Sequence, residues 1–214
     1  MMATATRSDS RIAVFAKAPV PGAVKTRLIP VLGARGAAAL HRALIARAIE
    51  TAAEAGIGAV ELWCTPDTGD PFFMDCSRRY GVALMQQGDG DLGARMQRAF
   101  ESMLSTSARA LLVGSDIPPM TPDYLREADA ALTGAHDAVL GPAEDGGYVL
   151  MGLRRVDAAL FGNIRWSKPD VFAVTRSRLA KLGWRHLEMS TLWDVDRPED
   201  LSRPGVPAVG PDGA

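Results

Sequence analysis

Apolar runs alternate with amphipathic stretches along most of the chain. Ala110–Val113 contains four consecutive apolar residues, which is typical of a strand buried on both faces of a parallel sheet. The segments with the pattern of strands are Arg11–Lys17, Ala59–Cys64, Val82–Gln86, Ala110–Val113, Ala138–Gly141, Tyr148–Leu153 and Arg185–Met189. The segments with the pattern of helices are Ala34–Ala55, Pro71–Tyr80, Leu92–Leu104, Pro122–Leu132 and Pro169–Leu182.

Helix boundaries in this pattern are marked by residues that favour helix ends. Asp91 and Thr121 stand where N-caps are expected, and Pro122 follows at a first helical position. Gly56 and Gly81 stand just beyond two helices, where a left-handed residue commonly ends a helix. These signals fix several element ends independently of the apolar pattern.

The order of elements predicts the fold class. Strands that alternate with helices imply a mostly parallel, Rossmann-like sheet flanked by helices, which is an α/β fold. Two closely spaced strands around Asp145-Gly146-Gly147 interrupt the alternation, so we expect a mixed sheet with an antiparallel excursion. The expected single domain spans residues 11–202, with flexible tails at 1–10 and 203–214 because the first is small and polar and the second is rich in Pro and Gly.

Composition narrows the kinds of partner. The 214 residues are 47% apolar and 23% charged, as in a soluble globular protein. The net charge of −1 gives no general attraction to nucleic acid or to an anionic membrane, and we find no stretch long enough to span a bilayer. Cys64 and Cys76 match no zinc or redox spacing and fit a reducing compartment. We therefore expect a cytoplasmic protein with no nucleic-acid or membrane partner.

Candidate chemistry starts at Gly114-Ser115-Asp116-Ile117-Pro118, directly after the buried strand 110–113. The carboxyl ends of parallel strands form the edge where ligands bind in open α/β sheets. A carboxylate held there is a hard oxygen ligand for a divalent metal on a nucleotide diphosphate. For this segment taken by itself, an equally good explanation is that Asp116 only caps the turn before Pro118.

The loop Lys17–Leu28 lies at the same predicted edge and carries three cations, two prolines and Gly22. The prolines stiffen the loop, which limits the ordering cost of binding. Lys25 and Arg27 are suited to phosphate oxygens, and Arg27 can bind them in a bidentate manner. Solvated surface charge is the alternative. The loop is neither a P-loop nor a G-x-G-x-x-G motif.

Two glycine-rich strings are further candidates. In 87–96, Gly90 allows close backbone approach and Arg95 lies one turn into a helix, although an ordinary turn and cap explains this string as well. In 141–148, paired glycines are joined by Glu144, Asp145 and Tyr148. A hairpin turn explains the glycines but not the whole string.

Near the end of the chain, Asp194-Val195-Asp196 precedes Pro198. Asp196 is suited to cap a helix that begins at Pro198, or to complete a two-carboxylate metal site with Asp116. The string 163–167 contains Trp166, which would either wall a pocket or pack in the core. The histidines His41, His136 and His186 have no Ser or Cys partner at a recognisable spacing and are interpreted as structural.

Taken as a set, these strings resemble a known family. F-A-K-x-P-x-P-G-x-V-K-T-R-L, G-D-L-G-x-R-M, G-S-D-x-P, D-G-G-Y-x-L and D-V-D-x-P-E-D-L occur in this order between about Ile12 and Leu201. The chain resembles a bacterial family of glycosyltransferase A-type (GT-A) proteins, long described as a domain of unknown function. Some members are labelled arsenosugar-biosynthesis glycosyltransferases or radical-SAM-associated transferases.

The resemblance implies the nucleotide-diphospho-sugar transferase fold, a GT-A domain, and a role for each string. Asp116 and Asp196 would hold Mg²⁺ or Mn²⁺, and Asp116 and Asp145 are the predicted catalytic residues, with Asp145 as the acceptor-side base. The predicted nucleotide-binding residues are Lys17, Gly22, Lys25, Thr26, Arg27, Gly90, Arg95 and Ser115. The predicted substrate-binding residues are Gly146, Gly147, Tyr148, Trp166 and Ser167.

Two departures keep the reaction type open. Sugar transferases of this fold typically carry Asp-x-Asp at the metal site, whereas Gly114 stands two residues before Asp116. In this the chain is similar to nucleotidyltransferases such as 2-phospholactate guanylyltransferases, yet the pyrophosphorylase loop G-x-G-x-x-x-R is reduced to Gly22.

Three functions follow. The first is metal-dependent glycosyl transfer from a nucleotide sugar to a small-molecule acceptor. The second is nucleotidyl transfer from a nucleoside triphosphate to a phosphorylated small molecule, with release of pyrophosphate. The third is a nucleotide-binding module without turnover. The family resemblance favours the first.

Overall fold

The computed structural model describes residues 8–166 and 168–210. The strands are β1 (Ser8–Lys17), β2 (Ala59–Thr65), β3 (Ala83–Gln86), β4 (Ser107–Gly114), β5 (Ala138–Pro142), β6 (Tyr148–Leu153) and β7 (His186–Glu188). The α-helices are α1 (Ile29–Ala55), α2 (Pro71–Tyr80), α3 (Leu92–Leu104), α4 (Pro122–Thr133) and α5 (Val171–Lys181). Short 3₁₀ helices are η1 (Thr26–Leu28), η2 (Ala158–Leu160) and η3 (Pro198–Ser202).

The strands form one seven-stranded sheet in the order β3-β2-β1-β4-β6-β5-β7. The pairs β1–β2, β1–β4, β2–β3 and β5–β7 are parallel, whereas β6 runs antiparallel to both β4 and β5. The predicted α/β fold with a mixed, mostly parallel sheet is therefore confirmed. The antiparallel excursion lies where the glycine pair interrupts the alternation, and its cause is the short β5–β6 connection, which leaves no room for a crossover helix.

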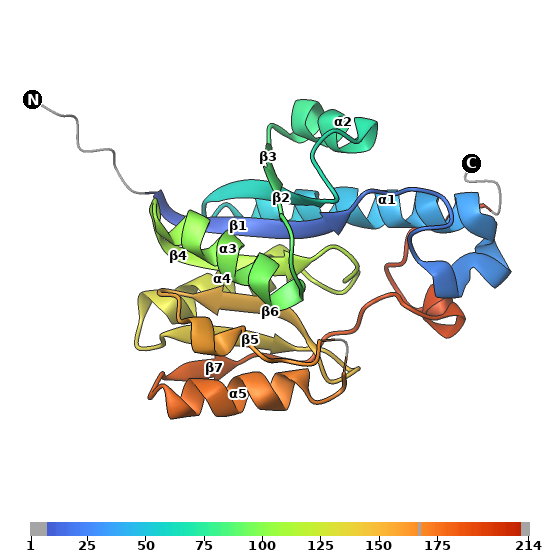
Figure 1. The fold of residues 1–214 in the computed structure, drawn as a ribbon. Helices are drawn as coiled ribbons and strands as arrows, with labels where there is room; N and C mark the ends of the chain where they lie inside the picture. Colours follow the sequence, from blue (N-terminus) through green and yellow to red (C-terminus); the bar gives the residue numbers. More distant parts are fainter. Residues whose placement is uncertain (1–7, 167, 211–214) are drawn as a thin grey trace, which may run out of the picture.

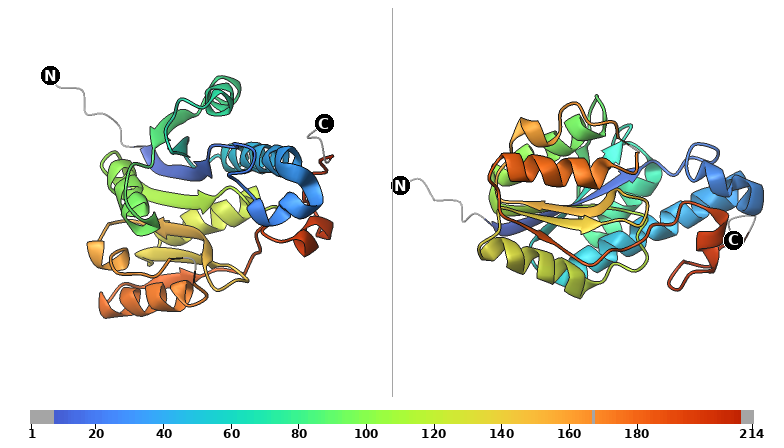
Figure 2. Two further views of the ribbon diagram at one scale, coloured as in Figure 1. Left: turned by 45° about the vertical axis from the view of Figure 1, so that its right-hand side comes forward. Right: turned by 90° about the horizontal axis from the view of Figure 1, so that it is seen from below.

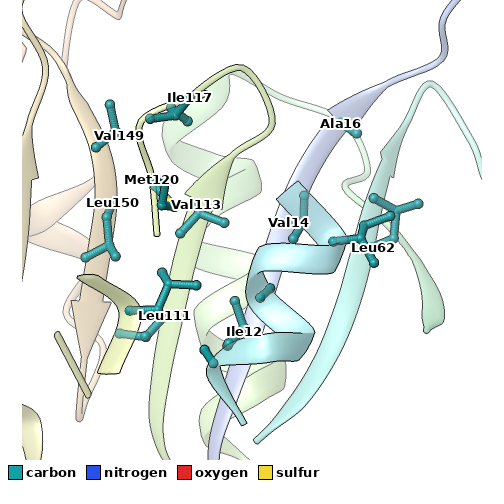
Figure 3. Close-up of a cluster of buried hydrophobic side chains, with 14 of the residues drawn as sticks. Ile12, Val14, Ala16, Leu62, Leu111, Val113, Ile117, Met120, Val149 and Leu150 are labelled. Atoms are coloured by element: carbon teal, nitrogen blue, oxygen red, sulfur yellow. The ribbon is translucent and has the colours of Figure 1, made fainter. Parts of the chain in front are cut away.

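Helices cover both faces of the sheet (Figures 1 and 2). On one face, apolar side chains of alternate strand residues, Ile12, Val14 and Ala16 among them, pack with residues of α1, α2 and α4 (Figure 3). On the other face, intervening residues such as Ala13 and Leu112 pack with α3 and α5. Successive residues of β1 thus point alternately into two hydrophobic cores, one on each face of the sheet, as expected for a strand buried on both faces.

Capping residues act as the sequence indicates. The carboxylate of Asp91 accepts a hydrogen bond from the backbone N–H of Ala94 at 2.9 Å, and the hydroxyl of Thr121 accepts one from Tyr124 at 3.2 Å. Gly56 and Gly81 end α1 and α2 in the left-handed conformation. These local signals need no tertiary contact, which is why the sequence predicts them well.

Several boundaries differ from the prediction. Helix α1 starts at Ile29, but Gly33, with a φ of 66°, interrupts it; the regular helix therefore begins at Ala34, as predicted, and a short helical segment that was not predicted precedes it. Helix α5 begins at Val171, because Pro169 belongs to the loop that contacts the glycine turn. Asp196 caps no helix: η3 follows Arg197, and the backbone N–H groups of Asp196 and Arg197 donate to the carboxylate of Asp200.

Residues 8–10 and 203–210, which fall within the expected tails, have defined contacts in the fold. Strand β1 begins at Ser8, and the side chain of Ser10 is fully buried. Near the other end, Val206 and Val209 pack against a small cluster formed by the start of α1 and Val195. The folded domain therefore extends beyond residues 11–202 on both sides.

The segment Thr26–Ala55 is long and apolar enough to cross a membrane by length and composition, contrary to the expectation that no stretch is. Half of its most apolar 18-residue window is buried inside the fold. Packing of α1 against the sheet and α4 accounts for the apolar composition, as in a core helix of a soluble protein.

Candidate functional site

Asp116 lies at the carboxyl edge of the sheet, just beyond the end of β4. The hydroxyl of Ser115 donates to its Oδ1 at 2.6 Å, and its backbone carbonyl accepts a hydrogen bond from the N–H of Val195 at 2.9 Å. The second bond attaches the C-terminal segment to the β4 loop. Two distant strings of the sequence, G-S-D-x-P and D-V-D-x-P, are thereby held side by side.

Lys25 contacts both of these segments. Its backbone adopts the left-handed conformation (φ 47°), and its ammonium group donates to Asp116 Oδ2 and, at 2.5 Å, to the carbonyl of Val195. The Lys25 side chain is only 6% exposed, whereas that of Asp116 is 31% exposed. Phosphate binding by Lys25 stays a prediction, and in this arrangement its charge is committed to Asp116.

The electrostatic surroundings keep Asp116 ionised. Burial by itself opposes the charged form, but the charges of Lys25 and His41 and the hydrogen bonds from Lys25 and Ser115 lower the pKa of Asp116 to about 2. A permanently ionised carboxylate, still one-third open to the pocket, is suited to bind a cation.

Asp194 is the carboxylate that responds most strongly to Asp116. Its pKa is raised to about 6, first by burial and then by the negative charges of Asp116 and Asp145. The three carboxylates therefore lie close enough to influence one another. The sequence predicted Asp196 rather than Asp194 as a metal ligand; both side chains are partly exposed, on either side of the fully buried Val195.

Three hollows meet at these carboxylates, and Asp145 and Asp194 line all of them. The central pocket, of about 290 Å³, is walled largely by apolar and aromatic residues and also contains Ser115, Asp116 and Lys168. The basic-loop pocket, of about 520 Å³, is lined by the loop after β1 and includes Lys17, Lys25, Thr26, Arg27, His41, Asp116 and Asp196. The outer pocket, of about 420 Å³, is lined by Arg27, Glu144, Lys168, Pro169, Trp193, Asp196, Arg197, Asp200 and Arg203.

The loop after β1 thus faces the same hollow as Asp116, as the sequence predicted from the topology of an α/β sheet. Lys17 is exposed and donates to the carbonyl of Ala23 at 2.9 Å. Arg27 is 66% exposed and forms an ion pair with Asp196. Gly22, with a φ of 84°, makes the turn of this loop but does not line the pocket.

His41 is a pocket residue that the sequence did not single out. Only 5% of its surface is exposed, and its Nε2 contacts the carbonyl oxygen of Lys17 at 3.0 Å. Because a carbonyl only accepts, Nε2 is the donor in this contact. Burial lowers the pKa of His41, although nearby Asp116 partly offsets the effect. Its position on α1 gives no local signal, because the pocket forms only when α1 packs beside β1.

Gly90 and Arg95 line none of the three pockets, although Leu92 beside them lines the central pocket. The guanidinium of Arg95 donates to the carbonyl of Gly90 at 3.0 Å, and Arg98 donates to the carbonyls of Gln87 and Asp89. These contacts hold the glycine-rich loop in place. Nucleotide binding by Gly90 and Arg95 stays a prediction.

The turn between β5 and β6 requires its glycine. Gly146 has a φ of 89°, and a Cβ there would lie 2.0 Å from the carbonyl oxygen of Pro169. The adjacent Asp145 accepts a hydrogen bond from the N–H of Gly147 at 2.9 Å, while its carboxylate lines the pockets. The close backbone packing therefore fixes Asp145, and Gly147 and Tyr148 line the central pocket beside it.

Trp166 walls the central pocket opposite the sheet. Its ring contacts Tyr148 edge-on, with centroids 6.4 Å apart, and packs so closely on Gly93 that a Cβ there would lie 2.7 Å from the Trp ring. The indole N–H of Trp166 is buried and has no hydrogen-bond partner among the described residues. Ser167, the other predicted residue of this string, lies outside the described residues.

The donor set fits a hard divalent cation. Within residues 8–166 and 168–210, no group of three or more His, Cys, Asp or Glu side chains is already arranged as a metal centre. However, Asp116 and Asp194 face the same pockets, and burial together with the charges of Asp116 and Asp145 raises the pKa of Asp194, as expected for carboxylates that lie close together. Carboxylate oxygens grouped in this way match the chemistry of Mg²⁺ and Mn²⁺.

Comparison with known proteins decides the family. A family model described as an uncharacterized protein conserved in bacteria (DUF2064) matches residues 48–168, more than half of the chain. This chain belongs to that family. Among proteins of curated function, none matches it in sequence. Neither the family description nor the three structures below carry an arsenosugar or radical-SAM name.

Solved structures relate this DUF2064 chain to transferases. A crystal structure from Desulfovibrio desulfuricans G20, provisionally named a nucleotide-diphospho-sugar transferase, is 32% identical with a TM-score of 0.81, over 89% of this chain and 83% of the other. CMP:2-keto-3-deoxy-manno-octonic acid synthetase complexed with CTP is 14% identical (TM-score 0.59; 91% and 95% of the chains). Glucosyl-3-phosphoglycerate synthase from Mycobacterium tuberculosis, in complex with Mn²⁺, UDP and glucosyl-3-phosphoglycerate, is 12% identical (TM-score 0.57; 94% and 81%).

These relatives are all transferases, and the fold that the DUF2064 chain shares with them is that of glycosyl- and nucleotidyltransferases. The two more distant structures establish the fold alone. They also show that one architecture accommodates a nucleoside triphosphate in one enzyme and a nucleoside diphosphate with Mn²⁺ in another.

Proposed function

We propose that this protein is a metal-dependent transferase of the nucleotide-diphospho-sugar transferase superfamily, which transfers a glycosyl group from a nucleotide sugar to a small-molecule acceptor. The observation that carries the proposal is the convergence of Asp116, Asp145 and Asp194 with the basic loop after β1 around one set of connected pockets. The 32% identity to the Desulfovibrio protein supports the choice of donor class.

Asp116 and Asp194 are the proposed ligands of Mg²⁺ or Mn²⁺. When bound, the ion would supply charge that stabilises the departing nucleoside diphosphate. Asp196, the ligand expected from the sequence, is instead paired with Arg27, so its charge is already compensated. Lys25 contributes by keeping Asp116 ionised and fixed in place.

The diphosphate is proposed to lie in the basic-loop pocket. Lys17 and Arg27 are exposed cations that line this pocket and would contact phosphate oxygens, with Arg27 exchanging its ion pair with Asp196 for the phosphate, and the hydroxyl of Thr26 would offer a further donor. Ser115 lines the central pocket next to Asp116 and is positioned for the sugar-phosphate portion. Aromatic walls formed by Tyr148 and Trp166 would exclude water from the reacting atoms.

Asp145 is the proposed acceptor-side base. In the transfer, the acceptor hydroxyl oxygen forms a bond to the anomeric carbon, and the bond from that carbon to the diphosphate oxygen breaks. The hydroxyl proton passes to the carboxylate of Asp145, which faces the central and outer pockets and so lies between donor and acceptor space.

Gly114 favours a second candidate, nucleotidyl transfer. It stands where Asp-x-Asp enzymes carry their first carboxylate, and a Cβ at this position would lie 2.9 Å from the Cδ1 of Ile117. That atom is the end of a flexible side chain and can move, so the absence of the first carboxylate is a feature of the sequence, and the strand end carries Asp116 without it. In this reaction an acceptor phosphate attacks the α-phosphate of a nucleoside triphosphate, and pyrophosphate leaves.

Calorimetric titration of the full chain with UDP and CTP, with and without Mn²⁺, tests the shared site. We expect metal-dependent binding that is lost in Asp194→Asn and in Asp116→Asn, which both retain an oxygen acceptor. Asp75→Asn, whose 65% exposed carboxylate lies on α2, is the matched control. Equal affinity in the presence and absence of Mn²⁺, or in all three variants, would exclude the proposed metal site.

Product analysis then separates the reactions. Incubation with nucleotide sugars is expected to release nucleoside diphosphate, whereas incubation with nucleoside triphosphates would release pyrophosphate in the second candidate function. Nucleotide binding that survives loss of Asp116, with no product from any donor, would instead identify a binding module without turnover.

A further inference from the structure

The outer pocket is the hollow that the proposed donor chemistry does not use. It opens from the carboxylates Asp145 and Asp194 toward the C-terminal segment and the Lys168–Pro169 loop. Because it shares Asp145 and Lys168 with the central pocket, a molecule bound there can present a hydroxyl to the reacting atoms. This is the position that an acceptor must occupy.

The pocket is strongly charged, with carboxylates outnumbering cations among its lining residues. Internal pairing takes three of the carboxylates and two of the cations out of the balance that a ligand meets, and leaves Asp145 and Asp194 facing Lys168 and Arg197. Glu144 accepts two hydrogen bonds at 2.8 Å from the guanidinium of Arg203, and Asp196 pairs with Arg27. The carboxylate of Asp200 is occupied by the backbone N–H groups of its own turn. These three carboxylates are therefore compensated before any ligand binds.

Two cations of the pocket are left without an anionic partner. Within residues 8–166 and 168–210, neither Lys168 nor Arg197 forms an ion pair, and both are exposed. Between them, Arg203 stacks over the ring of Trp193 with its central carbon 4.0 Å from the ring centroid. This stack, tied to Glu144, forms a rigid wall rather than a mobile charge.

We propose that the outer pocket binds the acceptor through an anionic group, a phosphate or a carboxylate, held by Lys168 and Arg197 while the acceptor hydroxyl faces Asp145. The proposal rests on the proposed function and specifies its acceptor as an acidic hydroxyl compound. A neutral acceptor would remove water from both cations without replacing it by an anion, which is unfavourable.

Anion binding can be measured without knowing the acceptor. Inorganic phosphate and malonate, used as separate probes, are titrated calorimetrically into the full chain, in the absence and presence of saturating UDP and Mg²⁺. The variants are Lys168→Ala/Arg197→Ala and, as matched control, Arg165→Ala, whose 84% exposed side chain lies outside the pockets. The comparison of the two probes distinguishes a phosphate from a carboxylate acceptor.

We expect at least one probe to bind, with affinity lowered about tenfold or more in the double variant, as for loss of charge-assisted contacts, and unchanged in the control. UDP affinity should be the same in all three proteins. No binding of either probe, or equal binding by the double variant, overturns the proposal. Failure of UDP to bind would contradict the proposed function instead, because the probe titration without nucleotide reports on Lys168 and Arg197 separately.

Discussion

Replacing Lys25 by methionine tests whether its ammonium group stabilises the contact between the Asp116 loop and the segment that contains Val195. Methionine preserves much of the side-chain volume but removes the charge that contacts Asp116 and the carbonyl of Val195. The Lys25 side chain is 6% exposed, so water cannot readily replace the lost contacts. The variant therefore leaves an anion and a carbonyl without their donor.

The magnitude follows from the pKa of Asp116. Its fall from 3.8 to about 2 corresponds to about 2 kcal/mol, at about 1.36 kcal/mol for each pKa unit. Burial opposes this fall and Lys25 is the largest of the causes that produce it, while solvent screens a carboxylate that is 31% exposed, so we expect loss of the Lys25 charge to cost about 1–2 kcal/mol. The unpaired Val195 carbonyl adds about 1–2 kcal/mol. We expect a total destabilisation of about 2–4 kcal/mol at pH 7.

Urea unfolding followed by circular dichroism measures this difference, and Lys17→Met is the matched control. Lys17 belongs to the same loop but is exposed and contacts only a carbonyl, so its loss should cost less than about 0.5 kcal/mol. Because the folded-state pKa of Asp116 is lowered, its stabilising effect is present above pH 3.8 and is lost as the pH falls toward 2. The difference between wild type and Lys25→Met should shrink over the same range.

Two results would refute this reasoning. If Lys25→Met and Lys17→Met unfold at the same urea concentration at pH 7, the ammonium group of Lys25 does not stabilise the folded protein. If the difference from wild type stays constant between pH 7 and pH 3, the loss does not arise from the pairing with Asp116.

Three further predictions concern the carboxylates, the glycine turn and the basic loop. Asp194→Asn should weaken Mn²⁺-dependent UDP binding, measured by calorimetry, by tenfold or more, whereas Asp196→Asn should change it by less than about threefold. The opposite order of effects would indicate that Asp196, not Asp194, binds the metal. Gly146→Ala should lower the free energy of unfolding by about 2–4 kcal/mol, because its Cβ would lie 2.0 Å from a backbone oxygen. In the control Gly162→Ala, whose Cβ would have its nearest contact at 3.6 Å, the free energy of unfolding should change by less than about 1 kcal/mol. Equal melting temperatures of the two variants would contradict the packing argument. Arg27→Ala should weaken UDP binding by about 2–3 kcal/mol with little effect on stability, since its side chain is 66% exposed, and an affinity within error of wild type would assign Arg27 to the solvated surface.

Most of the architecture is predictable because its signals are local. The helices Pro71–Tyr80 and Leu92–Leu104 begin and end at the predicted residues, since caps, prolines and glycines act within one turn of the chain. The start of α5 at Val171 rather than Pro169 was not predicted, because Pro169 lies in a loop that packs against the distant Gly146.

The site was predictable only as an edge of the sheet. The topology requires the loop after β1 and the end of β4 to lie together, and the structure brings Lys17, Arg27 and Asp116 to one pocket. Sequence alone did not show that Asp194 lines all three pockets, or that His41 lines the basic-loop pocket. Both depend on how distant segments pack together.

The sequence by itself determined the strand and helix pattern, the glycine turn and the edge at which polar residues gather. Only the tertiary structure decided which charges remain available to a ligand, because their pairing joins residues far apart in the chain. The ammonium of Lys25 meets the carbonyl of Val195 across 170 positions, and no local pattern specifies that contact. Electrostatic compensation is a property of the folded interior, where distance and burial set the strength of each charge.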